Sequence, residues 1–123
     1  SSMATVLLSD DAVQLAKRMM EQEAMSRPIL TIELAKDACP WSRDENGAIV
    51  WERIDEPSWV VRVVDWSRYE KRVADFAAKS CIELTGLKVL LSGSAQIAKG
   101  TLSVEARAGS FVLLHSLGGD AVP

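Results

Sequence analysis

Short apolar segments with strand-like alternation, separated by turn-forming residues, run through most of this chain and restrict it to a fold rich in β-structure. The clearest lies at residues 29–35, where Leu30, Ile32 and Leu34 alternate with Thr31 and Glu33, the pattern of a strand with one buried face. Similar signals predict strands at residues 49–51 and 59–64, within residues 81–91, and on both sides of residues 108–110. Together they predict a mainly β domain.

Two amphipathic helices complete the prediction. The first is expected from Ser9, as the N-cap, to about residue 25, because Asp10 and Asp11 place negative charge on its first turn. The second is expected at residues 67–79, where Ser67 and Glu70 have the spacing of a capping box. Its predicted apolar face consists of Tyr69, Val73, Phe76 and Ala77.

Length, charge and hydropathy exclude several classes of protein. A chain of 123 residues is expected to form one domain, with residues 1–4 a probable expression remnant or disordered and residues 116–123 a flexible tail. The net charge of −3 argues against nucleic acid as a partner. No apolar run approaches the roughly 20 residues that span a bilayer, so we expect no membrane partner and a cytoplasmic location.

Few residues of this chain could bind a metal or act as a nucleophile. The chain has one histidine and two well-separated cysteines, so we expect no self-contained zinc site. Two cysteines are too few for a disulfide framework, and we expect both to be reduced thiols. His115 follows an apolar run and is expected at a strand end, although Cys39 with His115 as its base remains open as a nucleophilic pair. Cys81 falls in a strand-like run and is expected to be a small core residue. Acidic residues interleave with four arginines, which predicts a solvated face: Arg43, Arg53, Arg62 and Arg68.

Three sequence blocks, taken in order, resemble the HesB-like, or A-type, iron–sulfur cluster biogenesis family. "TVLLSDDAVQLAKRMM" is similar to its opening strand and helix, and "LTIELAKDAC" to the strand that leads into its first cysteine, which places Cys39 at that position. "CIELTGLKVLLSGSAQIAKGTLSVE" resembles its third block, with Gly86, Val89, Gly100 and Thr101 at matching positions. The resemblance spans about residues 5–114. It implies two small mixed sheets packed together, an N-terminal helix, and an inserted second helix at residues 67–79.

The departures from the family bear on function. Members hold iron or a cluster with the first cysteine and a Cys-x-Cys pair near the C-terminus, whereas this tail, "LHSLGGDAVP", contains no cysteine. The family's glycine-rich turn is replaced by Lys36, Asp37 and Ala38 before Cys39 and by Pro40 after it. The resemblance therefore marks Cys39 as an inherited cofactor-ligand position, but one thiol does not hold a cluster within one chain.

We therefore expect a divergent, non-catalytic member that serves as an interaction or regulatory module in iron–sulfur or sulfur metabolism, with no resident cofactor or metal. Its partner would be another protein or a second copy of the chain. One alternative is a carrier of iron, sulfur or a cluster that uses Cys39 shared across a dimer or with a partner. The other is a thiol-dependent enzyme that uses Cys39. In each case Cys39 is expected to lie in a loop after the strand, partly accessible and more reactive than Cys81.

Overall fold

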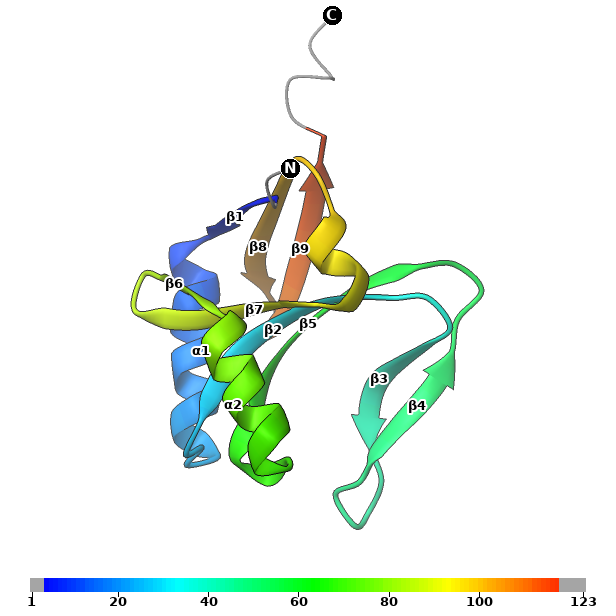
Figure 1. The fold of residues 1–123 in the computed structure, drawn as a ribbon. Coiled ribbons are helices and arrows are strands. Elements are labelled where there is room, and N and C mark those ends of the chain that lie inside the picture. Colours follow the sequence, from blue (N-terminus) through cyan, green and yellow to red (C-terminus); the bar gives the residue numbers. More distant parts are fainter. Residues whose placement is uncertain (1–3, 118–123) are drawn as a thin grey trace, which may run out of the picture.

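The fold is α+β and mostly strands, with two mixed sheets, a separate hairpin and two α-helices (Figure 1). We describe it from a computed structural model, which defines residues 4–117, apart from the side chains at positions 41 and 42. Ala4, expected to be disordered, is buried in the core, and Ser116 belongs to the last strand. Leu117 is exposed just beyond that strand, and residues 1–3 and 118–123 of the predicted terminal segments lie outside the described residues.

The first sheet has three strands in the order β1 (Thr5–Leu8), β8 (Thr101–Arg107) and β9 (Ser110–Ser116). β1 runs parallel to β8, and β9 is antiparallel to it. The β8–β9 turn has positive φ at both central residues, 50° at Ala108 and 77° at Gly109, as a tight two-residue hairpin requires. The strands predicted around residues 108–110 are therefore confirmed as one hairpin.

The second sheet has four strands in the order β5 (Ser58–Asp65), β2 (Pro28–Ala35), β7 (Leu87–Ser92) and β6 (Ile82–Leu84). β2 lies between antiparallel β5 and parallel β7. Successive residues of β2 are buried, so both of its faces are covered. The prediction for residues 29–35 is confirmed. Gly86, with Thr85, forms the turn of the β6–β7 hairpin.

A third sheet departs from the prediction of two. β3 (Ala38–Arg43) and β4 (Ile49–Arg53) form an antiparallel hairpin that projects from the body of the molecule (Figure 1). Its turn contains Gly47, as the Asn-Gly signal predicted. The expectation that Cys39 lies in a loop is wrong, since Cys39 sits within β3 opposite Glu52 of β4. Pro40 is tolerated because the pairing register shifts between Cys39 and Ser42.

The N-terminal helix forms as expected but ends earlier. α1 (Asp10–Gln22) begins at Ser9, whose Oγ accepts a hydrogen bond from the amide of Ala12 over 3.1 Å. Its buried face consists of Ala12, Val13, Leu15 and Ala16. With apolar residues from the two larger sheets, this face builds the main core, whose largest fully buried members are Leu30, Ile32, Val89, Leu102 and Val104.

The second helix begins four residues later than predicted. A 3-10 turn, η1 (Trp66–Arg68), comes first, and α2 (Lys71–Ser80) begins after Glu70, which makes no side-chain capping bond. The capping box fails because Ser67 is bound by Asp65, which caps η1. A second 3-10 turn, η2 (Gly93–Ile97), links β7 to β8. Among the described residues, no helix is long and apolar enough to cross a membrane.

Candidate functional site

Cys39 is closed off from solvent. Its side chain has 0% relative exposure and packs against aliphatic neighbours, Ala35, Val60 and Ile54, where the β3–β4 hairpin joins the second sheet. β2 and β5 supply two of these neighbours, so the thiol lies beneath the base of the hairpin. The prediction that Cys39 is partly accessible is therefore wrong, and the reason is its pairing with β4.

The surroundings of Cys39 also disfavour its thiolate. Burial raises the pKa of the Cys39 thiol above its ordinary value, and the negative charge of Glu33 raises it further. A hydrogen bond with Ser58 acts in the opposite direction, and Glu52 adds a smaller increase. A metal ligand or nucleophile must be a thiolate, so this environment suits neither role.

The other two candidates do not join Cys39. Cys81, expected in the middle of a strand, instead terminates α2 and is only partly buried, with its Sγ donating to the carbonyl of Ala78 over 3.0 Å. His115 is confirmed as a residue near the end of a strand, β9. Its Nε2 lies 2.7 Å from the carbonyl oxygen of Lys99, and its ring packs edge-on against Trp59. The hydrogen bond and the ring contact give His115 a role in packing at this strand.

The apolar neighbours of Cys39 offer no ligand for iron or a cluster, and the carboxylates that act on its pKa are those of Glu33 and Glu52. Across residues 4–117, no three His, Cys, Asp or Glu side chains lie close enough to hold a metal ion together. A cluster at Cys39 would thus require ligands from another molecule, and also the opening of the hairpin base.

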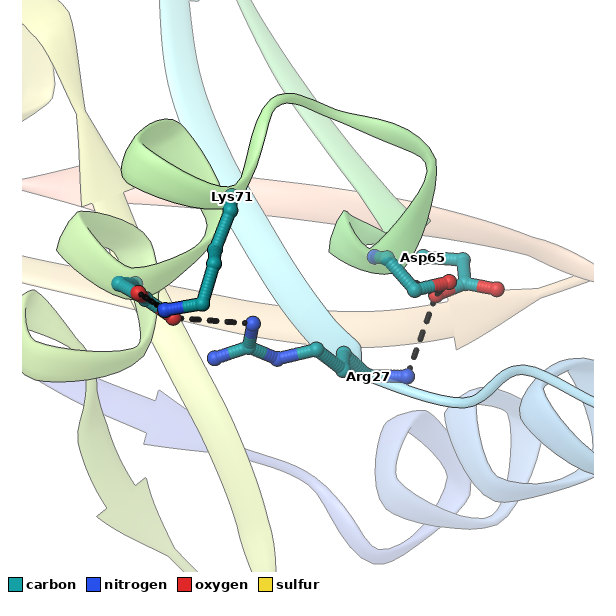
Figure 2. Close-up of polar contacts among 5 residues, drawn as sticks. Arg27, Asp65 and Lys71 are labelled. Atoms are coloured by element: carbon teal, nitrogen blue, oxygen red, sulfur yellow. Dashed lines mark hydrogen bonds and ion pairs between the residues drawn. The ribbon is translucent and has the colours of Figure 1, made fainter.

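A polar cluster ties α2 to the strands beneath it (Figure 2). Arg27, just before β2, donates its backbone amide to Asp65 over 3.1 Å and its guanidinium to Asp75 of α2 over 3.1 Å. Lys71 reaches the other oxygen of Asp75 over 2.8 Å. These bonds pair most of the charge at this end of α2, so the cluster positions the helix and is not itself a reactive site.

The outer face of α2 carries an exposed aromatic side chain, that of Phe76. The predicted apolar face is only partly correct, because Ala77 is buried but Phe76 is 65% exposed and Tyr69 and Val73 are also exposed. The buried face carries small residues, Ala74 and Ala77. α2 packs closely on Ile29 and Leu90 of the second sheet, which places larger side chains outward.

One further grouping of residues was not predicted from the sequence. Arg43 of β3, Arg62 of β5 and Arg68 of η1 line a single cavity, although they lie far apart in the sequence. The expectation of a solvated face holds for Arg43, Arg53 and Arg68, which are exposed, whereas Arg62 is half-buried. Acidic residues are interleaved with these arginines along the sequence, so no basic cluster is visible there. Only the fold brings the three residues together.

Comparison with known proteins gave no match: no family model, no curated protein and no solved structure is similar to this chain.

Proposed function

We propose that this protein is a divergent, A-type-like interaction module of iron–sulfur or sulfur metabolism, acting in the cytoplasm without catalysis and without holding a cluster by itself. The HesB-like resemblance supplies the metabolic setting. The observation that carries the proposal is the burial of Cys39, the one cysteine at an inherited ligand position, at 0% exposure.

The environment of Cys39 weighs against both alternatives. A carrier must pass its cargo to another protein, and a thiol enzyme must bring substrate to its sulfur, so both need an accessible thiolate. Here the thiol is covered by Ala35, Val60 and Ile54, and burial raises its pKa. Either alternative would require β3 to separate from its neighbours before any chemistry begins.

The interaction surface in this proposal is the outer face of α2. Phe76 stands exposed between basic side chains, Arg72 and Lys79, on a molecule whose net charge is −3. Lys71 adds a further positive charge, and Asp75 is already paired with Lys71 and Arg27. An aromatic anchor with a charged rim is the arrangement that concentrates binding energy in protein interfaces.

The charge of this face indicates the partner's chemistry. A protein surface with an apolar pocket and an acidic rim would complement Phe76 and its basic neighbours. A second copy docking by the same face is disfavoured, because a two-fold interface would bring the basic Arg72 and Lys79 of one copy near the basic side chains of the other. We therefore propose a different, acidic protein as the occupant.

Anaerobic reconstitution with iron and sulfide tests the absence of autonomous cluster binding. We expect the desalted protein to contain no stoichiometric iron and to show no visible charge-transfer absorption, because Cys39 is buried and one thiol does not hold a cluster within one chain. Stoichiometric iron whose absorption disappears in Cys39→Ser would overturn the proposal in favour of the carrier. The same result in Cys81→Ser would assign the ligand to the other thiol, and would equally contradict it.

A matched pair of variants tests the interaction face. Phe76→Ser removes the proposed anchor, whereas Ile97→Ser removes a side chain of similar exposure, 79%, on η2. Proteins captured from a cell extract by the unmodified chain should be lost with Phe76→Ser and kept with Ile97→Ser. Addition of salt should weaken their capture, because the rim is charged. Equal capture by all three chains would contradict docking on α2.

A further inference from the structure

A cavity of about 190 Å³ lies beside the edge strand β5 and is lined by three arginines. Arg43 comes from the end of β3, Arg62 from the middle of β5 and Arg68 from η1. Tyr69 and apolar residues such as Met25 and Ile49 complete part of the wall. Three separate elements therefore each contribute an arginine to the lining of one cavity.

These guanidinium groups lack charge partners. Within residues 4–117, none of Arg43, Arg62 and Arg68 makes an ion pair, and Arg43 donates only to the carbonyl of Gly47, over 2.9 Å. The Nε of Arg62 is buried without an acceptor in the described part of the chain. A buried donor of this kind carries an uncompensated desolvation cost, which is larger for a charged group.

Two carboxylates also line the cavity but do not neutralise the arginines. Asp65 already accepts hydrogen bonds from the amides of Ser26, Arg27 and Ser67 and from the hydroxyl of Ser67. Glu23 lies exposed just beyond α1 and forms no ion pair with a described residue. The formal charge of the lining is therefore positive, with three arginines against two carboxylates.

We propose that this cavity binds a phosphate-type oxyanion. Arginine pairs with phosphate through parallel charge-assisted hydrogen bonds, and three arginines from three different elements line this cavity. The cavity is several times larger than the about 30 Å³ that one water molecule occupies, so a polyatomic anion can enter. Such a ligand would give the buried Nε of Arg62 an acceptor and would pair with the charges of Arg43 and Arg68, which are exposed.

The chemistry fits either free phosphate or a phosphoryl group on a larger ligand, and two probes separate these sources. Calorimetric titrations with inorganic phosphate and with phenyl phosphate, at constant ionic strength set with chloride, measure the affinity of each. The phenyl ring would contact Tyr69, Met25 or Ile49 at the cavity wall. Tighter binding of phenyl phosphate assigns the site to an esterified phosphoryl group, and equal or weaker binding assigns it to free phosphate.

Three glutamine variants test the site. Arg62→Gln and Arg68→Gln should each weaken the probe that binds by about tenfold or more, as expected for loss of a charge-assisted hydrogen bond. Arg53→Gln is the matched control, because Arg53 is exposed on β4 and does not line the cavity. Arg68 is itself exposed, so its variant carries the test if Arg62→Gln does not fold. No saturable binding of either probe, or equal weakening by Arg53→Gln, would overturn the proposal.

Discussion

The backbone amide of Arg27 donates to Oδ1 of Asp65 over 3.1 Å, which joins the start of β2 to the end of β5. The same carboxylate binds Ser67, the central residue of η1, through its amide and its hydroxyl. One side chain thereby sets both the β2–β5 junction and the turn that leads into α2. The position of α2, and of the proposed interaction face on it, depends on this residue.

Replacing Asp65 by Ala should destabilise the protein by about 2 kcal/mol, because the amides of Arg27 and Ser67 lose their acceptor in a part-buried setting. Urea denaturation of both chains measures the difference. Asp55→Ala is the control, since Asp55 is exposed, and it should change stability by less than about 0.5 kcal/mol. Equal stability of the two variants would mean that this junction is held by strand pairing alone.

Acid should remove the contribution of Asp65. The hydrogen bond from Ser67 is the main cause that lowers the pKa of Asp65 from its ordinary 3.8 to about 2, and backbone amides assist. A carboxyl with a lowered folded-state pKa stabilises the fold above its unfolded pKa, and this stability is lost as the pH falls through the folded value. Asp75, whose pKa is lowered by Lys71 and then Arg27, acts in the same direction.

Unfolding free energies measured between pH 5 and pH 2 should therefore fall more steeply for the unmodified chain than for Asp65→Asn, with the difference concentrated between about pH 4 and pH 2. Parallel pH profiles would show that the carboxylate is no better stabilised in the folded state than in the unfolded state.

Local patterns predicted most of this fold. Alternation identified β2, an apolar run after a turn signal identified β5, and the Ser9 cap with its acidic first turn identified the start of α1. Tertiary contacts produced the errors. Asp65 binds the hydroxyl of Ser67, and α2 therefore begins later than predicted. The buried face of α2 packs on Ile29 and Leu90 through alanine, whereas Phe76 lies on the exposed face. Neither the hydrogen bond to Ser67 nor the packing of α2 on the sheet can be predicted from a helical pattern alone.

The candidate sites were harder to predict for the same reason. Residues around Cys39 lack clean alternation and contain Pro40, which favours a loop, but pairing with β4 converts the segment into a strand and buries the thiol. The cavity joins Arg43, Arg62 and Arg68 only because the hairpin, the edge strand and η1 meet. The positions of the charged residues in the sequence do not predict that these three elements lie side by side.

Gly100 should be the least replaceable glycine. Its φ is +83°, and an added Cβ would overlap the carbonyl oxygen of Ser116 at the end of β9. Gly100→Ala should cost about 1–2 kcal/mol for the left-handed backbone and roughly a further 1–3 kcal/mol for the overlap. Gly109→Ala is the control, since its φ of +77° is similar but its Cβ would meet nothing within 4 Å. Thermal unfolding of both variants should rank Gly100→Ala as clearly the less stable; similar melting temperatures would contradict the close approach.

Native-state alkylation should modify Cys81 well before Cys39, the reverse of the order expected from sequence. Cys39 is 0% exposed beneath the hairpin, and burial raises its pKa, so both access and thiolate fraction are low. Cys81 is partly exposed at the end of α2. Iodoacetamide treatment with mass mapping of the two peptides measures the order, and a denaturant pulse should make the rates similar.

Rapid modification of Cys39 without denaturant would have a specific structural meaning. It would show that β3 separates from Ala35 and Val60 often enough to expose the thiol. Cys39→Ser should then leave the rate at Cys81 unchanged, because the two residues belong to different apolar clusters. That combination of results would support the carrier alternative, because Cys39 would then be an accessible ligand. It would directly oppose a role limited to protein interaction.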